Sequence, residues 1–276
     1  MTEQNKVVVV ATMTVPPIFY HIFRHPLPYT RTLALQERLH ELQLSARRSA
    51  SHSDLLLLLE HRPVYTAGRR QSESSLEEDR TRLTSIGADF VTTSRGGQLT
   101  YHGPGQIVGY PLLDLARAGS PTMGIREYIC RLQKTLEDYL RTAHGLSHVP
   151  SEHTGVFLNA TTKIASIGVQ VRHRLTTHGF ALNVTRQPLP WFGQVVACGL
   201  SEVKAGCVEE AIGGNKSLQM MDEMSSVLDA FRRVFGRGMV KLGVEDDRPM
   251  LDAISALETD AERMSDCPPS PSSIRS

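Results

Sequence analysis

Residues 95–109 form the segment of this chain whose residue types most clearly indicate chemistry. The segment reads Arg-Gly-Gly-Gln-Leu-Thr-Tyr-His-Gly-Pro-Gly-Gln-Ile-Val-Gly, so five glycines and a proline surround Arg95 and His102. Glycine costs stability in regular structure, and such a density therefore indicates backbone in unusual conformations or pressed close to a ligand. The alternative interpretation is a glycine-rich hairpin without chemistry.

A second candidate is Cys198, which lies in Val-Val-Ala-Cys-Gly-Leu. A thiol becomes a good nucleophile only when a neighbouring cation or base raises its thiolate fraction. Gly199 would let the backbone turn so that its amide faces an oxyanion. Taken alone, such a cysteine is more often a small buried hydrophobic residue than a nucleophile.

Lys163 opens the segment Lys-Ile-Ala-Ser-Ile-Gly and is the partner that such a cysteine would need. In a strand it shares a face with Ala165, Ile167 and Val169, so we expect its stem to point inward. A lysine partly withdrawn from water has a lowered pKa and exchanges protons near neutrality. The alternative is a solvated strand end.

Three histidines lie next to glycine or proline at predicted strand boundaries, which suggests that they converge on a pocket. They are His61, four residues before Tyr65, then His102, and then His178, which directly precedes Gly179. Each could instead be structural. Their spacings are not those of a metal site, and we expect none.

Composition limits the class of protein. The formal net charge of +1 lacks the basic excess of a nucleic-acid-binding protein, and the longest apolar run, Leu55–Leu59, is too short to cross a bilayer. The four cysteines show no CxxC pairing and do not suggest disulfides, which favours a reducing compartment. We therefore expect a soluble globular protein. Residues 1–50 hold five arginines and one lysine against three acids, which leaves mitochondrial import open.

Hydrophobic periodicity predicts the elements that position these residues. Helices are predicted after Pro28 with Leu35, Leu39 and Leu42 on one stripe, after Pro121 with Ile125, Ile129, Leu132, Leu136 and Leu140, and at Met220, Met224, Val227, Phe231 and Phe235. Asp54–Glu60 reads as a buried strand, and 163–172 and 180–184 as paired strands. Residues 45–53 are predicted to be a loop, and 71–89 a loop with a short helix.

Strands and helices intermix without a regular alternation, which favours an α/β protein of the α+β type, with a mixed sheet flanked by helices. We expect residues 1–24 to be a leader or first strand, 25–240 to be a catalytic domain and 258–276 to be a disordered tail.

Five motifs, taken in order, resemble those of the lipoyl(octanoyl) transferases. They are Glu-His-Arg-Pro-Val-Tyr-Thr-Ala-Gly, Arg-Gly-Gly-Gln-Leu-Thr-Tyr-His-Gly-Pro-Gly-Gln, Lys-Ile-Ala-Ser-Ile-Gly, His-Gly-Phe-Ala-Leu-Asn and Ala-Cys-Gly-Leu. The resemblance covers about residues 25 to 240. It implies the fold of the biotin and lipoate protein ligases, and transfer of an octanoyl or lipoyl group to a lysine of a lipoyl domain through a cysteine thioester, the first step of protein lipoylation.

The resemblance also implies residue roles. Cys198 resembles the nucleophile and Lys163 the residue that activates it and shuttles protons. Three segments resemble the acyl-binding residues: Arg95, Gly96, Gly97, Gln98, Leu99, Thr100, Tyr101 and His102; Ser166, Ile167 and Gly168; and Gly179, Phe180 and Ala181. His61, Tyr65 and His178 are further pocket candidates. Ala197 departs from the proline that many relatives have before the cysteine, which would loosen that turn.

The implied donor is octanoyl-acyl carrier protein, and the implied acceptors are lipoyl domains of 2-oxoacid dehydrogenase complexes and the glycine cleavage H protein. Because a thioester is already activated, we expect neither ATP nor a metal, and no nucleic acid or membrane span. The location would be mitochondrial in a eukaryote and cytoplasmic otherwise. From charge alone, Arg69, Arg70, Arg172 and Arg174 are candidates for docking an acidic carrier. Cys130, Cys207 and Cys267 should be dispensable.

Two other functions remain open at this point. An ATP-dependent lipoate or biotin ligase of the same fold would form an acyl-adenylate and need no cysteine nucleophile. A non-catalytic acyl-binding protein would need neither Cys198 nor Lys163 for chemistry.

Overall fold

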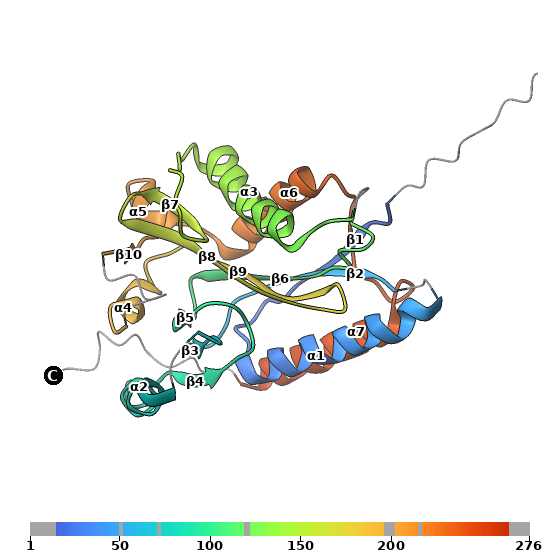
Figure 1. The fold of residues 1–276 in the computed structure, drawn as a ribbon, viewed down its shortest axis with the longest axis horizontal. Coiled ribbons are helices and arrows are strands. Elements are labelled where there is room, and N and C mark those ends of the chain that lie inside the picture. The colour runs from blue at the N-terminus through green and yellow to red at the C-terminus, as the bar shows by residue number, and fades with distance from the viewer. Residues whose placement is uncertain are drawn as a thin grey trace, which may run out of the picture.

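The central strand β2 (Asp54–Leu59) is buried at all six positions. Because successive side chains of a strand face opposite sides, Leu56 and Leu58 join one hydrophobic cluster, whereas Leu55, Leu57 and Leu59 join another. The sheet around β2 is therefore the middle of three layers, with helices on both faces (Figure 1). The computed structural model describes residues 15–49, 52–70, 73–118, 122–195, 202–214 and 217–264.

The main sheet has eight strands in the order β10-β8-β9-β6-β2-β1-β11, with β7 paired to β8. Parallel and antiparallel pairs both occur: β1 runs parallel to β2 and β11, whereas β2, β6, β9 and β8 alternate in direction. The remaining bounds are β1 Ile18–Ile22, β6 Gln106–Leu112, β7 Val156–Asn159, β8 Thr162–Arg172, β9 Leu175–Asn183, β10 Lys204–Ala205 and β11 Met239–Lys241. The predicted mixed sheet is confirmed.

A second sheet of three short strands, in the order β4-β3-β5, lies beside the first (Figure 1). Its strands are β3 (Val64–Ala67), β4 (Asp89–Thr92) and β5 (Thr100–His102). It is packed against α2 (Glu73–Ser85) and the short helix α4 (Leu189–Phe192) through one aromatic cluster that includes Tyr65, Tyr101 and Trp191. Sequence periodicity gave no sign of these strands, because none is longer than four residues.

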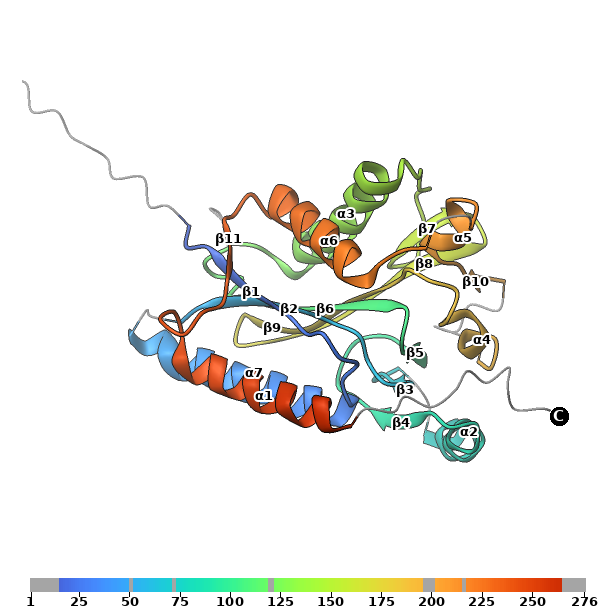
Figure 2. The same cartoon turned by 180° about the vertical axis from the view of Figure 1, so that it is seen from behind.

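Two helix pairs cover the main sheet. Helices α1 (Tyr29–Ala46) and α7 (Arg248–Arg263) lie on one face, and α3 (Ile125–His144) and α6 (Met220–Phe235) lie on the other, as both views show (Figures 1 and 2). A 3-10 turn at Arg47–Ser49 follows α1, and the short α5 (Val208–Ala211) follows β10. The predicted helix at Met220–Phe235 has the observed bounds. Within the described residues, no helix combines the length and apolarity that a membrane span requires.

Three sequence expectations are wrong in detail. The helix predicted after Pro121 begins at Ile125, and Ile125 is 51% exposed rather than part of the buried stripe, because it lies in the first turn beyond the sheet. Residues 258–263 are not a tail but the end of α7, whose Leu257 and Ala261 are buried against the α1 side of the sheet. The loop predicted at 45–53 starts two residues too early, since α1 extends to Ala46. The rest of the expected tail and the segment before residue 15 lie outside the described residues.

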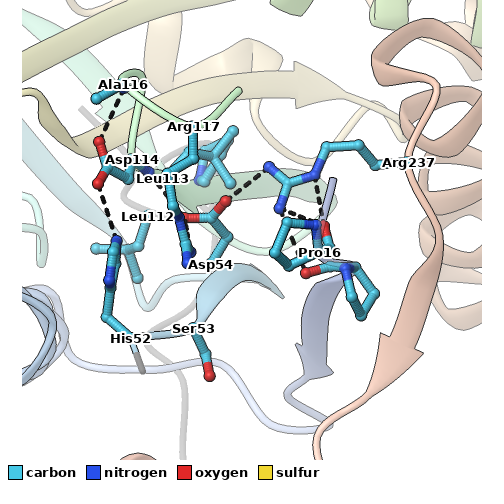
Figure 3. Close-up of polar contacts among 12 residues, drawn as sticks. Pro16, His52, Ser53, Asp54, Leu112, Leu113, Asp114, Ala116, Arg117 and Arg237 are labelled. Carbon is cyan, nitrogen blue, oxygen red and sulfur yellow. Dashed lines mark hydrogen bonds and ion pairs between the residues drawn. The ribbon is translucent and has the colours of Figure 1, made fainter. Parts of the chain in front are cut away.

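A buried ion network links the start of β2 to neighbouring segments of the chain (Figure 3). Asp54, fully buried at the start of β2, forms ion pairs with Arg237 at 2.6 Å and Arg117 at 3.2 Å. Arg237 also donates to the carbonyl of Pro16, at 2.6 Å from Nη2. The carboxylate of Asp54 accepts the backbone amide of Asp114 at 2.8 Å. The network joins β2 to the segments just before β1 and β11 and to the segment just after β6.

Candidate active site

A cavity of about 280 Å³ opens on the α1 side of the main sheet. Its floor comes from β6, β8 and β9, and its other wall comes from the glycine-rich segment, β5 and the first residue of α1. Predicted residues that line it are Arg95, Gly96, Gly97, Gln98, Thr100, His102, Lys163, Ser166, Ile167, Gly168, His178, Gly179, Phe180 and Ala181. Three segments far apart in sequence therefore meet around one space.

Glycines bring the walls of this cavity close together. Gly168 and Gly179 are paired residues of β8 and β9. A Cβ on Gly179 would lie 2.1 Å from the carbonyl oxygen of Gly109, and one on Gly168 would lie 3.1 Å from the carbonyl oxygen of Gly96. The amide of Gly96 in turn donates to the carbonyl of Val169 at 3.3 Å. The glycine-rich segment is thus a lid that is bonded to β8 and lines the cavity.

Arg95 holds that lid in place. Its guanidinium, in a residue only 7% exposed, donates from Nη2 to Thr66 and to the carbonyl of Gln98 at 2.9 Å, and from Nη1 to the carbonyl of Gly96 at 3.0 Å. The backbone amides of Arg69 and Arg70 bond to the carbonyls of Arg95 and Gly97, both at 3.2 Å. Arg70 lines the cavity, and both Arg69 and Arg70 are exposed.

Lys163 lies half-buried in the cavity wall, near the start of β8. Its Nζ is 5.5 Å from the centre of the Phe157 ring. Space for the side chain comes from Gly155, whose φ of +131° favours glycine and whose Cβ would lie 2.5 Å from the Cε of Lys163. The simple alternation that we expected fails here, since a register shift between β7 and β8 buries Ile164 and Ala165 in one cluster.

The predicted histidines take two kinds of position. His102 lines the cavity, whereas His61 is fully buried behind it, donating from Nδ1 to the carbonyl of Leu27 at 3.0 Å and accepting the Tyr110 hydroxyl at 2.7 Å. The direction follows because a carbonyl can only accept. Burial lowers the pKa of His61 to about 4 and that of His102 well below its usual range.

His178 is unusual in both backbone and side chain. Its φ is +58°, in the left-handed region that side chains rarely adopt, and it is 2% exposed. Neither ring nitrogen has a hydrogen-bond partner among the described residues, while its backbone amide donates to Gln36 at 2.8 Å. Burial, with repulsion from Arg95 and Arg172, lowers its pKa to about 4. A neutral imidazole therefore lies in the cavity wall.

Four predicted pocket residues do not line the cavity. Because side chains alternate along β5, Thr100 and His102 face the cavity, whereas Leu99 and Tyr101 face the aromatic cluster of the small sheet. Tyr65 pairs with Tyr101 in that sheet and donates to the carbonyl of Trp191 at 2.7 Å. His61 is the fourth, as described above. Their contacts are those of packing residues.

Sequence reasoning missed several lining residues: Tyr29, Arg70, Val108, Tyr110, Glu152, His153 and Thr154. Tyr29 begins α1 and Tyr110 lies within an apolar strand, so neither stands out from core residues. The segment 152–154 reaches the cavity through the β7–β8 hairpin, which joins it to Lys163. Only knowledge of that pairing would have indicated it.

Two of the four cysteines, Cys130 and Cys207, lie within the described residues. Cys198, the predicted nucleophile, lies outside the described residues, as do Ala197 and Cys267. Cys207 is buried, which raises its pKa to about 11, and Cys130 is exposed on α3, on the far side of the sheet from the cavity. Neither of these two is suited to the role of a nucleophile in the cavity. Among the described residues, no group of three or more His, Cys, Asp or Glu side chains is arranged to hold a metal ion.

The fold is that of known lipoate ligases. It matches a lipoate-protein ligase A bound with ATP (TM-score 0.61, 14% identity, 88% of this chain and 95% of that one) and a bipartite lipoate protein ligase from Thermoplasma acidophilum (TM-score 0.61, 14% identity, 88% and 92%). Residues 28–232 also match the family model of the lipoyl protein ligase A/B catalytic domain. The protein therefore belongs to the class of lipoyl protein ligase A/B catalytic domains.

Curated relatives narrow this class. The chain is 34% identical over 220 residues to an octanoyltransferase of Caldicellulosiruptor saccharolyticus, covering 79% of this chain and 89% of the relative. It is 36% identical over 206 residues to a mitochondrial octanoyl-[acyl-carrier-protein]:protein N-octanoyltransferase of Xenopus tropicalis, covering 74% and 81%. The chain belongs to the octanoyltransferase family, which confirms the resemblance seen in its motifs.

Proposed function

We propose that this octanoyltransferase takes its acyl group from octanoyl-acyl carrier protein and passes it, through a thioester on Cys198, to a lysine of a lipoyl domain. The observation that supports this most is the position of Lys163. It lies in the wall of the same cavity as the three segments whose motifs resemble acyl-binding residues. Carrier and acceptor are the substrates that the printed names of relatives indicate.

The cavity suits a single alkyl chain. Its volume of about 280 Å³ lies just below the range of known ligand sites, which runs from about 300 to 1,000 Å³. Val108, Phe180 and Ala181 offer apolar surface, and each buried methylene would contribute roughly 0.8 kcal/mol to binding. Gly96 and Gly168 add no side chains to the cavity wall where their backbones approach one another, which suits an unbranched alkyl chain.

The chain returns to Lys163 after the segment that contains Cys198. Ala205, seven residues beyond the cysteine, pairs with Lys163 across β10 and β8, and the amide of Gly206 donates to the carbonyl of Lys163 at 2.9 Å. This connection supports a dyad in which Lys163 acts on Cys198.

In the proposed reaction, Lys163 accepts the proton of the Cys198 thiol, and the thiolate attacks the carbonyl carbon of the donor thioester. The bond to the carrier sulfur breaks, and that sulfur leaves with the proton from Lys163. The acceptor amine then attacks the new thioester, transferring one proton to Lys163, and the Cys198 sulfur leaves and takes that proton. The free-energy change of thioester exchange is close to zero, whereas formation of the amide is favourable and makes the overall transfer favourable.

Since the donor is already activated, the proposed reaction needs neither ATP nor a metal ion. A mitochondrial location is proposed if the source is a eukaryote, because relatives from Xenopus tropicalis and Danio rerio are named as mitochondrial. The cytoplasm is proposed otherwise.

An ATP-dependent ligase is the second candidate, favoured only by the shared fold with a ligase bound to ATP. A transfer assay separates the two. Purified protein is mixed with a lipoyl domain and either octanoyl-acyl carrier protein alone or octanoic acid with ATP, and the mass of the lipoyl domain is measured. The proposal predicts an octanoyl-modified domain with the carrier alone. Modification only with acid and ATP would establish the ligase.

A further inference from the structure

A chain of buried hydrogen bonds connects His102 in the cavity wall to the backbone beside Lys163. His102 Nδ1 bonds to Gln106 Oε1 at 2.8 Å, Gln106 Nε2 bonds to Asn183 Oδ1 at 2.8 Å, and Asn183 Nδ2 bonds to the carbonyl of Gly206 at 3.0 Å. His102, Gln106 and Asn183 are each at most 7% exposed. The chain is therefore shielded from water over its whole length.

The donor and the acceptor of every hydrogen bond in this chain can be assigned from its last group, the carbonyl of Gly206. The carbonyl of Gly206 can only accept, so Asn183 must present its amide nitrogen there and its oxygen to Gln106. Gln106 then donates from Nε2, as its second bond to the carbonyl of Tyr101 at 3.3 Å also requires. Its oxygen consequently faces His102, whose Nδ1 must carry the proton. The Nε2 of His102 is left as a bare acceptor.

The surroundings of His102 keep the ring in this neutral form. The Tyr29 ring stacks on it with centres 6.0 Å apart, and the His61 ring lies 5.8 Å away. Besides burial, the charge of Arg95 and the neighbouring rings of His61 and His178 disfavour a proton on His102, and its pKa is well below the usual range. The ring is thus a fixed acceptor at neutral pH.

The same residue, Gly206, also bonds to the backbone of Lys163. While the carbonyl of Gly206 accepts from Asn183, its amide donates to the carbonyl of Lys163 at 2.9 Å. His102 and Lys163 are therefore held relative to one another by one rigid chain of groups, and both line the cavity. The cavity thus presents the hydrogen-bond acceptor of His102 together with Lys163. This pair would suit an amine nitrogen, which carries two N–H bonds.

We propose that His102 is a further catalytic residue, which accepts a hydrogen bond from the attacking amine of the acceptor lysine during amide formation. The proposal rests on the thioester route described above. One N–H proton of the amine moves to Lys163 as the C–N bond forms and the C–S bond breaks, and the other stays on nitrogen and is held by His102 Nε2. The nitrogen lone pair is thereby directed at the thioester carbon.

This role separates the two halves of the reaction. Loading of Cys198 exchanges one sulfur for another and involves no amine, so it should not need the hydrogen-bond acceptor on His102. Discharge to the lipoyl domain should need this hydrogen bond. A residue that only shapes the pocket would affect both halves alike.

The test uses His102→Phe in the full-length protein, which keeps a ring but has no acceptor. Loading from octanoyl-acyl carrier protein is followed by intact mass, and discharge to a lipoyl domain is followed in a single turnover. Because His102 also lines the acyl cavity, loading can slow as well, and we expect discharge to be slowed at least about tenfold more than loading. Equal slowing of both steps, or normal discharge, would overturn the proposal. Failure of the unsubstituted protein to load at all would instead refute the thioester route.

If His102→Phe does not fold, Gln106→Glu provides the second variant. A carboxylate beside Nδ1 favours the imidazolium, whose Nε2 carries a proton and cannot accept. Discharge should then be slow at about pH 6.5 and recover by about pH 8.5, with loading little changed. A discharge profile identical to that of the unsubstituted protein would overturn the assignment. Arg95, His61, His178, Tyr29 and Tyr110 all face this region and are unchanged in the comparison.

Discussion

The guanidinium of Arg95 binds Thr66 at two atoms at once. Nη2 of Arg95 lies 2.6 Å from the carbonyl oxygen of Thr66 and 2.8 Å from its hydroxyl, both in the buried interior. Thr66 belongs to the small sheet, and the residues after Arg95 cover the cavity against the main sheet. This contact therefore joins the two sheets through the wall of the proposed active site.

Replacing Arg95 with alanine should both destabilise the protein and disorder the lid. Several buried oxygen atoms would lose their donor, and we expect the free energy of unfolding to fall by about 2–4 kcal/mol. Urea denaturation measures this. Arg38→Ala is the matched control, since Arg38 is exposed and pairs with Glu41 of its own helix, and it should change stability by less than about 0.5 kcal/mol. Equal effects of the two substitutions would show that the Arg95 contact is unimportant.

The Asp54 network makes a prediction about stability without activity (Figure 3). Asp54→Asn leaves Arg237, whose side chain is 3% exposed, and Arg117 without their buried counter-charge. We expect a loss of about 3–5 kcal/mol in the free energy of unfolding. Transfer activity of the folded protein should persist, because the network does not line the cavity. Asp252→Asn, which breaks an exposed pair with Arg248, should cost no more than about 0.5 kcal/mol. A similar small loss for Asp54→Asn would contradict the account.

The buried histidines predict a loss of stability in mild acid. His178 has a pKa of about 4 in the folded protein and its ordinary 6.5 when unfolded. Above pH 6.5 it is neutral in both states and contributes nothing to the pH dependence. As the pH falls below 6.5, His178 binds a proton in the unfolded chain but stays neutral in the folded chain. The free energy of unfolding therefore falls. At about pH 5 the loss is about 2 kcal/mol.

The variant His178→Asn tests this, because asparagine tolerates the left-handed backbone of that position. The difference in unfolding free energy between about pH 7 and about pH 5 should shrink by about 2 kcal/mol relative to the unsubstituted protein. Exposed His25, replaced by glutamine, should leave that difference unchanged. An unaltered pH dependence in His178→Asn would mean that the residue is not held neutral.

Carrier docking is predicted to depend on two arginines rather than four. Arg172 is paired with Glu37 at 2.6 Å, and Arg174 donates to the carbonyls of Leu115 and Met123. Arg69 and Arg70 are exposed, and Arg70 lines the cavity. They are the better candidates for binding an acidic carrier.

Reversing both charges, with Arg69→Glu and Arg70→Glu, should raise the KM for octanoyl-acyl carrier protein by about tenfold, with a smaller change in kcat. The effect should fade as salt is added. Arg126→Glu, on α3 beyond the sheet, is the control of equal charge and should leave KM unchanged. A KM that is unaffected by the double reversal would place the carrier elsewhere.

Local pattern predicted the long elements of this fold well and the short ones poorly. Helix α6 repeats a buried stripe and was predicted, as was β8, whereas the strand predicted at 180–184 covers only the second half of β9, which is buried at every position. The strands of the small sheet are at most four residues long, too short to show a period. The last helix, α7, was hidden by its polar outer face, although Met250, Ile254 and Leu257 recur at helical spacing.

The site was predictable where a motif carried it and not where tertiary pairing decided it. The glycines and Lys163 were identified from the sequence, whereas Leu99, Tyr101 and Tyr65 were assigned to the pocket although alternation in β5 and pairing with β3 turn them away. Tyr29 and Tyr110 were missed because an aromatic residue in a cavity wall looks, in sequence, like one in a core. The register shift beside Lys163 likewise follows from a partner strand that the local pattern does not reveal.

The central claim, a thioester on Cys198 formed without ATP, is tested most directly by intact mass. The protein is incubated with octanoyl-acyl carrier protein, with neither ATP nor acceptor, and weighed alongside Cys198→Ala, Cys130→Ala and Cys207→Ala. We predict one added octanoyl group on the unsubstituted chain and on the last two variants, and none on Cys198→Ala. An octanoyl group that persists on Cys198→Ala, or no group on the unsubstituted chain, would contradict the account.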